Sequence, residues 1–336
     1  MSIIHVDFAW DLGEFDYDND EFEIRGTYGY RYLHYVGTKT KGEDILIPDG
    51  IRTCVSMFYG CTSLETAPSI PSSVNNCWSM FHGCTSLKVG PDNIPSGVKY
   101  CSDMFGGCTS LEVGPDNIPS GVEDCSDMFA GCTSLKVAPK ILVYHPEIDG
   151  IMGCTRMFAG CTSLEIAPII PDRVFGCDSM FEGCTSLKVA PEIPESFDDC
   201  TRMFAGCTSL KVAPEIPENV SDCKGMFEGC TSLKVAPEIS ESIHNCTGMF
   251  SGCTSLEIAP IIPSSVEECN FMFKDCTSLL ETPVLPDGIK HCRSMFEGCT
   301  SLKIAPEMVP AGIRDCTDMF KDCTSLKNRP ILMIVL

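Results

Sequence analysis

Cysteine is the residue type in this chain whose number and spacing could do chemistry, as a metal ligand, a disulfide partner or a nucleophile. The 336 residues include 24 cysteines, which fall into twelve pairs whose members are seven positions apart. The pairs begin at Cys54, Cys77, Cys101, Cys125, Cys154, Cys177, Cys200, Cys223, Cys246, Cys269, Cys292 and Cys316. Any chemical interpretation has to fit this regularity.

The spacing within a pair argues against zinc and against local disulfide bonds. Structural zinc sites favour about two to four residues between cysteines, whereas six residues lie between the members of each pair. Positions i and i+7 of a helix lie about 10.5 Å apart, beyond the roughly 7 Å that a disulfide bridges. Disulfides between equivalent cysteines of adjacent repeats remain geometrically conceivable. We favour reduced thiols packed in the core, because cysteine is readily buried and free thiols fit an intracellular origin.

No other group of residues predicts catalysis, a metal or a cofactor. Asp16, Asp18 and Asp20 begin like a calcium-binding loop, but Glu21 and Thr27 stand where the loop needs glycine and glutamate. A solvated acidic turn is favoured there over a loose calcium site. The six histidines are scattered: His5, His34, His82, His145, His244 and His291. We therefore expect no enzyme activity and no cofactor.

The cysteines belong to a repeat, C-x-x-M-F-x-x-C-T-S-L, that occurs twelve times, mostly at a period of 23 or 24 residues. This period is typical of leucine-rich repeats, in which each repeat forms one rung with a short strand and a helical or 3₁₀ return. Cys200, Met203, Phe204 and Cys207 have the i, i+3, i+4, i+7 spacing of an apolar helical stripe. The remaining interior positions predicted for this rung are Leu210, Val212, Ile216 and Val220.

The repeat predicts a right-handed solenoid with parallel strands on one face and short helical returns on the other. We expect a small β-rich N-terminal cap at 1–43, a twelve-repeat solenoid at 44–327 and an apolar C-terminal strand or assembly tail at 328–336. The period breaks once, where 29 residues separate Cys125 from Cys154. The additional residues fall near 140–146 and must form a loop on one face.

These motifs resemble the BspA-like leucine-rich-repeat family, in particular its branch with MFxGCTSLxxAP repeats. The resemblance spans roughly Asp44 to Leu326, and the segments Glu21–Gly26, Tyr35–Gly37 and Asp44–Ile51 are similar to the family's N-terminal cap. Such a resemblance implies the fold with high specificity. It implies function more broadly, because the family includes surface adhesins, host-interaction proteins and phage products.

Charge and hydropathy narrow the partners and the location. A formal net charge of −22 disfavours nucleic acid, whose phosphates are bound by clustered basic residues. No apolar run reaches the roughly 18 residues of a membrane span, so we expect no membrane insertion. The first residues, MSIIHVDFAW, do not resemble a secretory signal. This favours an intracellular or virion location over conventional secretion to the cell surface.

Two features depart from what packing alone requires and are the candidate binding sites. The first is a pattern of opposite charges four positions apart after each repeat leucine, in which Lys188, Lys211 and Lys234 match Glu192, Glu215 and Glu238. It is either a solvated edge whose charges relieve repulsion between rungs or a recognition ribbon. The second is the insertion, whose Ile141, Leu142 and Tyr144 are apolar for a surface loop.

The apolar C-terminal segment suggests self-association. A solenoid's last rung leaves an apolar cross-section and a strand edge that need a cover. Ile331, Leu332, Met333, Ile334, Val335 and Leu336 could seal it or join a second subunit. Together these features predict a non-enzymatic protein that binds or adheres to a protein or glycan through an extended repeat surface. The alternative is a structural virion component or filament subunit.

Overall fold

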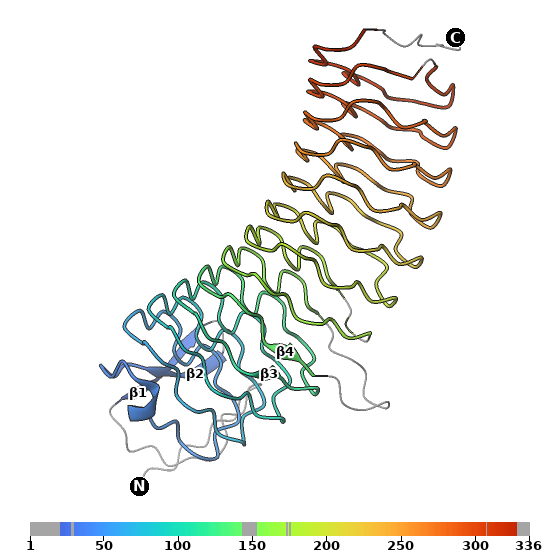
Figure 1. Ribbon diagram of the computed structural model, residues 1–336. Helices are drawn as coiled ribbons and strands as arrows, with labels where there is room; N and C mark the ends of the chain where they lie inside the picture. Colours follow the sequence, from blue (N-terminus) through green and yellow to red (C-terminus); the bar gives the residue numbers. More distant parts are fainter. Residues whose placement is uncertain are drawn as a thin grey trace. The chain divides into compact units, whose positions relative to one another are not determined.

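A computed structural model describes residues 21–27, 30–142, 153–172, 174, 176–306 and 308–327. These residues form two compact units, Met1–Phe175 and Gly176–Leu336, called here unit 1 and unit 2 (Figure 1). Five of the cysteine-pair repeats begin in unit 1 and seven in unit 2. Most of the insertion, Tyr144 included, the start of the expected cap and the C-terminal segment 328–336 lie outside the described residues.

Regular secondary structure is sparse in the described residues. Strands β1 (Phe22–Thr27) and β2 (Tyr30–Tyr35) form an antiparallel hairpin, and a 3₁₀ helix, η1, covers Gly42–Asp44. The short strands β3 (Asn117–Ile118) and β4 (Lys140–Ile141) pair in parallel. Elsewhere adjacent rungs meet through single parallel bridges, such as Val189 with Val212 and Asn245 with Glu268. The expected parallel pairing is therefore present, although most rungs contribute a bridge rather than a strand.

The helical returns expected from the cysteine spacing are wrong for the described rungs, where this segment is a chain of tight turns. Every second backbone N–H bonds three residues back within its rung, as in Met203 to Cys200 at 3.2 Å. The alternate N–H groups donate to carbonyls of the next rung instead, as in Phe204 to Met226 at 3.0 Å. Because an α-helix requires every N–H to bond four residues back, this division of donors between two rungs excludes it. We call the segment the turn arm.

Left-handed backbone at two positions of each turn arm explains the departure from a helix. In the rung of Cys200, Arg202 has φ 55° and Gly206 has φ 74°. A helix of L-residues does not pass through this region, and glycine and aspartate tolerate it best. Asp275 and Asp322 replace the usual glycine at the Gly206 position, with φ of 59° and 60°. The apolar spacing of a helical stripe thus describes the residues that face inward, whereas the backbone that carries them is a different structure.

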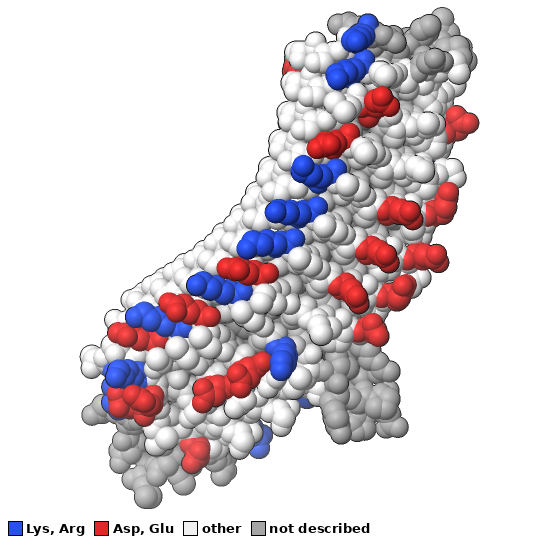
Figure 2. Space-filling model, in the orientation of Figure 1, with Lys and Arg blue, Asp and Glu red and all other residues white. Residues whose placement is uncertain are grey.

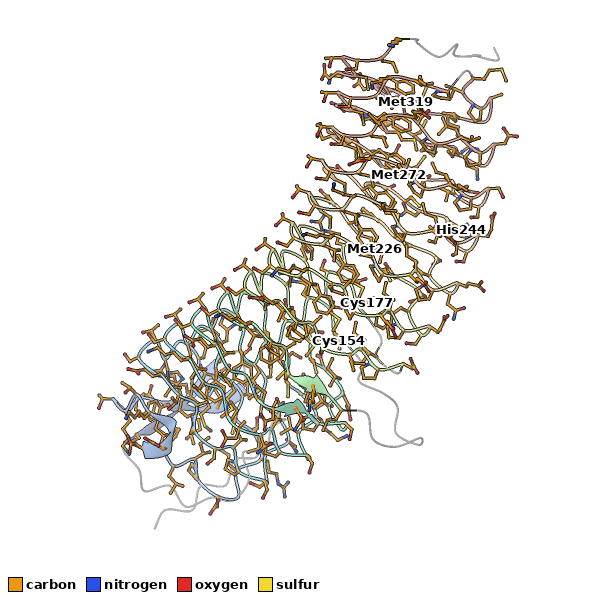
Figure 3. All side chains as sticks on the ribbon, in the orientation of Figure 1. Cys154, Cys177, Met226, His244, Met272 and Met319 are labelled. Atoms are coloured by element: carbon orange, nitrogen blue, oxygen red, sulfur yellow. The ribbon has the colours of Figure 1, made fainter. Side chains whose placement is uncertain are left out.

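The interior of each unit is built from the repeated Cys, Met, Phe and Leu side chains. The phenylalanine rings stack from rung to rung, with centroids 5.2 to 5.5 Å apart from Phe58 to Phe158 in unit 1. In unit 2 the same stack runs from Phe181 to Phe320 at 5.4 to 5.8 Å. Methionines such as Met226 and Met272 are fully buried beside them (Figure 3). Neighbouring rungs therefore bury what one rung cannot bury alone.

One predicted interior position is wrong. Leu210 and Val220 are fully buried and Ile216 is partly buried, but Val212 points outward and is 69% exposed. The sequence carries a sign of this, because Thr66 and Glu281 occupy the same repeat position as Val212. A position that accepts glutamate without an interior partner belongs on the surface.

The hairpin meets the first rung through Tyr35, which makes the contacts of a repeat phenylalanine. Its N–H donates to the Met57 carbonyl at 2.7 Å, as the N–H of Phe58 donates to Met80 at 2.8 Å. Its ring lies 5.2 Å from that of Phe58, and its carbonyl accepts the Cys61 thiol at 3.8 Å. Tyr35 thereby adds one aromatic ring to the end of the phenylalanine stack of unit 1. Its N–H also satisfies the Met57 carbonyl of the first rung.

Candidate binding surface

Three parallel bands follow the repeat leucines on the outside of unit 2. In each rung the buried leucine is followed by an extended segment, such as Lys211–Glu215, before the chain turns at a proline-rich corner. The basic band is Lys188, Lys211 and Lys234, and the acidic band is Glu192, Glu215 and Glu238, all of them exposed. The apolar band between them is Val189, Val212, Val235, Ile258 and Ile304. Parallel pairing between rungs aligns equivalent positions, so the three types form separate bands over the rungs of Cys177, Cys200 and Cys223, whereas Glu257 takes the lysine position and Glu281 the apolar position in the next two rungs.

The apolar band exposes large side chains that an ordinary surface would cover. Its five members are between 51% and 70% exposed. In the rungs of Cys177, Cys200 and Cys223 the neighbouring alanine and proline, such as Ala213 and Pro214, are partly exposed and widen it. Val189, Val212, Val235 and Ile258 occupy four consecutive rungs, and Glu281 separates them from Ile304. Contiguous apolar surface, as over these four rungs, marks interaction sites more often than scattered single residues do. Sequence reasoning missed this band because it placed Val212 and its equivalents inside.

The opposite charges lie on opposite sides of the apolar band. In an extended segment the four steps from Lys211 to Glu215 separate their Cα atoms by about 13 Å, which does not favour an ion pair between them. The ion pairs seen at the lysine position instead join adjacent rungs, Lys234 to Glu257 at 3.8 Å and, in unit 1, Lys88 to Glu65 at 3.9 Å. Figure 2 shows a row of charged side chains crossing successive rungs and a second, acidic group separated from it by uncharged residues.

Unit 1 carries the same apolar position but another charge pattern. Val113, Val137 and Ile166 are exposed there, and the preceding residues alternate in sign, being Glu112, Lys136 and Glu165 in turn. Unit 1 therefore has no uniform basic band among its described residues.

The two described insertion residues differ. Ile141 is buried in β4, whose parallel pairing sets it opposite Ile118, and Leu142 is exposed. The structure thus places Ile141 away from the surface and leaves Leu142 on it.

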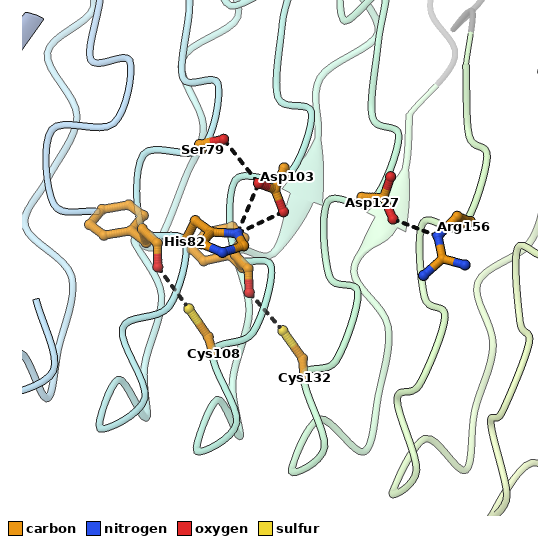
Figure 4. Close-up of polar contacts among 9 residues, drawn as sticks. Ser79, His82, Asp103, Cys108, Asp127, Cys132 and Arg156 are labelled. Atoms are coloured by element: carbon orange, nitrogen blue, oxygen red, sulfur yellow. Dashed lines mark hydrogen bonds and ion pairs between the residues drawn. The ribbon is translucent and has the colours of Figure 1, made fainter. Parts of the chain in front are cut away.

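The second cysteine of most pairs is a hydrogen-bond donor in the core. The thiol of Cys108 donates to the Phe81 carbonyl at 3.0 Å and that of Cys132 to Phe105 at 3.1 Å (Figure 4). The same contact recurs in unit 2, for example from Cys230 to Phe204 at 3.2 Å. All the cysteines are free thiols, and all but Cys61, Cys316 and Cys323 are buried.

Burial makes these thiols poor nucleophiles. Desolvation raises the pKa of Cys230 to about 12 and, likewise, that of Cys161 to about 12. Thiolates attack electrophiles and thiols do so poorly. The cysteines are therefore placed for packing and hydrogen bonding.

Ser79, His82 and Asp103 converge in unit 1 without the order of a catalytic triad. The Ser79 hydroxyl donates to Asp103 at 3.0 Å, and Nδ1 of His82 lies 2.9 Å from the same carboxylate (Figure 4). The carboxylate thus lies between serine and histidine, whereas activation of a serine requires the histidine in the middle. The His82 ring also stacks on Tyr59 at 4.8 Å. This cluster ties two turn arms together.

A shallow hollow of about 340 Å³ lies on the turn arms of unit 2 beside Gly225, Gly248 and Phe271. Arg202 crosses its edge and bonds Glu182 at 2.9 Å and also Glu228. Lys274 pairs with Glu297 at 3.4 Å. Its arginine and one of its lysines thus already have acidic partners, and the hollow has no arrangement of nucleophile, base and oxyanion donors.

Candidate metal sites and membrane-spanning helices are both absent from the described part of the chain. No group of three or more His, Cys, Asp or Glu side chains there could hold a metal ion. No helix among the described residues has the length and hydropathy to cross a membrane.

Rungs of this length, with a repeated buried leucine and parallel bridges, define a leucine-rich-repeat protein. Comparison with family models gives a match to the BspA-type leucine-rich-repeat region over 154–257, 177–303 and 223–331. The chain therefore belongs to the BspA-type leucine-rich-repeat family, as its motifs indicated. Residues 49–142 also match a family described as Mycoplasma protein of unknown function, DUF285.

One solved structure with a TM-score above 0.5 supports the same fold. A leucine-rich-repeat protein from Bacteroides ovatus has 23% sequence identity and a TM-score of 0.54, with 92% of this chain and 93% of that chain covered. A leucine-rich cell surface protein from Faecalibacterium prausnitzii has 20% identity, a TM-score of 0.48 and 94% of both chains covered. No curated protein matches the sequence significantly.

Proposed function

We propose that this chain is a non-enzymatic binding protein that recognises an extended protein or glycan through the three bands of unit 2. The observation that carries the proposal is the apolar band, five β-branched side chains at least half exposed, of which Val189, Val212 and Val235 lie between the basic and the acidic band. Family membership supports repeat-based binding or adhesion as the general class. Catalysis has no comparable support among the described residues.

The bands are suited to binding because they are rigid and regular. The rungs beneath them are joined by backbone hydrogen bonds from each turn arm to the next, so little conformational entropy is lost when a partner docks. Full burial of a large aliphatic side chain contributes roughly 1.5 to 3 kcal/mol. Partial burial of several such side chains therefore provides a favourable contact area, and the flanking charges add orientation.

The proposal is tested by selecting ligands and then altering the bands. The full chain, rather than isolated unit 2, is screened against a printed glycan array and a phage-displayed library of random peptides. The affinity of each enriched ligand is then measured for the unaltered chain and for the triple variant that carries Val189→Ser, Val212→Ser and Val235→Ser. We expect at least about tenfold weaker binding, since each truncated anchor removes about 1 kcal/mol or more.

The matched control alters exposed residues away from the bands. Lys224 and Arg293 lie at exposed positions of the turn arms. The substitutions Lys224→Glu and Arg293→Glu should therefore leave binding unchanged. Circular dichroism and thermal unfolding verify that all variants fold. Enrichment of no ligand, or equal loss in band and control variants, would contradict the proposed function.

A further inference from the structure

We propose that the bands of unit 2 pair with the same bands of a second copy of this chain, face to face and parallel, around a two-fold axis that runs along the bands. The inference rests on the proposed function and names its partner. It would make binding homotypic, with one array adhering to another.

The first argument is that a second copy has the same repeat distance. The bands recur once per rung, and neighbouring rungs lie about 4.8 Å apart at their parallel bridges. An unrelated partner would fall out of register with successive rungs, whereas a parallel copy stays in register over all of them. The regular spacing of the bands therefore favours a second copy of this chain over an unrelated protein as the partner.

The second argument is charge complementarity, which depends on the direction of the symmetry axis. A two-fold axis parallel to the bands exchanges their two sides, so that the basic band of one copy faces the acidic band of the other. Lys188 then lies opposite Glu192 of the second copy, and Lys211 opposite Glu215. An axis across the bands would instead set lysine against lysine, which costs free energy.

The third argument comes from the rungs that lack these charges. The axis parallel to the bands matches rung with rung, so each residue at the lysine position faces the residue four positions further along in the other copy. In the rung of Cys269 these two residues are Leu280 and Val284, both exposed and both apolar. Where the lysine is replaced by leucine, the glutamate is replaced by valine, as the pairing requires.

Two rungs depart from the rule. In the rung of Cys269, Glu281 stands at the apolar-band position and would meet Glu281 of the second copy at the axis, so this rung opposes the pairing that its neighbours favour. In the rung of Cys246, Glu257 would face Ile261 of the second copy. Glu257 already lies 3.8 Å from Lys234 of the neighbouring rung. The apolar band covers the centre of the interface, where Val212 would meet Val212 of the second copy at the axis.

The inference is tested by reversing charges and mixing the variants. The first variant carries Lys188→Glu, Lys211→Glu and Lys234→Glu, and the second carries Glu192→Lys, Glu215→Lys and Glu238→Lys. Masses are measured by light scattering and sedimentation equilibrium near 0.15 M salt, where charges beyond about 8 Å are screened. We expect the unaltered chain to dimerise and each variant alone to dissociate at least about tenfold more readily.

The decisive result is the mixture. Because each band of the first variant then meets an oppositely charged band of the second, the two should form a one-to-one heterodimer. The combined six-fold exchange should restore the homodimer, and Lys224→Glu with Arg293→Glu should not affect it. A monomeric unaltered chain, or variants that fail to pair on mixing, would overturn the inference.

The test also separates the inference from the proposed function. A monomeric chain whose apolar-band variant loses a selected peptide or glycan would retain the proposed function and reject the homotypic partner. A dimer that obeys the mixing rule while no foreign ligand is enriched would support the homotypic partner and reject recognition of a foreign ligand.

Discussion

At the scale of single residues, the cysteines illustrate how burial changes chemistry. Twenty-four thiols could in principle bind metals or oxidise. In the rungs the second thiol of most pairs is instead committed to a phenylalanine carbonyl of the preceding rung, as from Cys207 to Phe181 at 3.2 Å. Cysteine suits this position because it is small, apolar and still able to donate a hydrogen bond.

The raised thiol pKa values predict a loss of stability in alkali. An unfolded thiol has a pKa near 8.5, whereas burial raises the pKa of Cys230 and of Cys276 to about 12. Between these values the unfolded chain binds fewer protons than the folded chain, so the free energy of unfolding falls as pH rises. Below about pH 8 the buried thiols contribute no pH dependence.

Urea unfolding at a series of pH values measures this effect. Each buried thiol contributes at most about 1.4 kcal/mol per pH unit to the slope of the free energy of unfolding. Cys230→Ala should therefore lower the total slope by the contribution of one thiol. At neutral pH a thiol reagent should label the folded chain first at Cys61, Cys316 and Cys323, which are partly exposed. A stability that stays constant above pH 9, or equally rapid labelling of all cysteines, would contradict the burial described.

The burial of the cysteines followed from their apolar spacing, whereas the outward direction of Val212 did not. Alternation along a strand predicts that Leu210 and Val212 face the same side. Since most rungs here form only a single bridge, strict alternation is not maintained, and Lys211 and Val212 are both exposed. Consequently the charged half of the candidate surface could be predicted from the sequence and its apolar half could not.

At the scale of the elements, the turn arm is where sequence and structure differ most. Apolar residues at i, i+3, i+4 and i+7 are typical of a helix, yet the same inward-facing set is produced here by turns that share their N–H donors with the next rung. The information that decides between them is the left-handed backbone. It is visible in the sequence only as the glycine or aspartate that precedes the second cysteine.

This backbone predicts an unusual order of substitutions at Gly229, which has φ 71°. An added Cβ would lie 3.7 Å from Cα of Gly206, an ordinary contact, so the cost of alanine is conformational and about 1 to 2 kcal/mol. Gly229→Asp should cost less than Gly229→Ala, because Asp275 and Asp322 adopt this conformation at the same repeat position. Chemical unfolding compares the two, and an alanine variant more stable than the aspartate variant would contradict the left-handed assignment.

At the scale of the whole molecule, the repeat explains both the fold and the surface. The repeat predicted a leucine-rich-repeat protein, and the family match confirms that prediction. The surface follows because any residue type that recurs in the repeat becomes a band once rungs stack in parallel. Partner identity could not be predicted in the same way, since it depends on which side chains face outward and in what order they cross the rung.

The central claim, that the bands of unit 2 form the binding surface, is tested most directly by lysine footprinting. The chain is labelled with an amine-reactive reagent at a protein concentration at which light scattering shows a monomer, alone and saturated with a selected peptide or glycan, and each lysine is quantified by mass spectrometry. We predict that Lys188, Lys211 and Lys234 are protected in the complex, whereas Lys224 and Lys321, which lie on the turn arms, react as in the free chain. Unchanged reactivity of the three band lysines, or protection of the turn-arm lysines alone, would contradict the account.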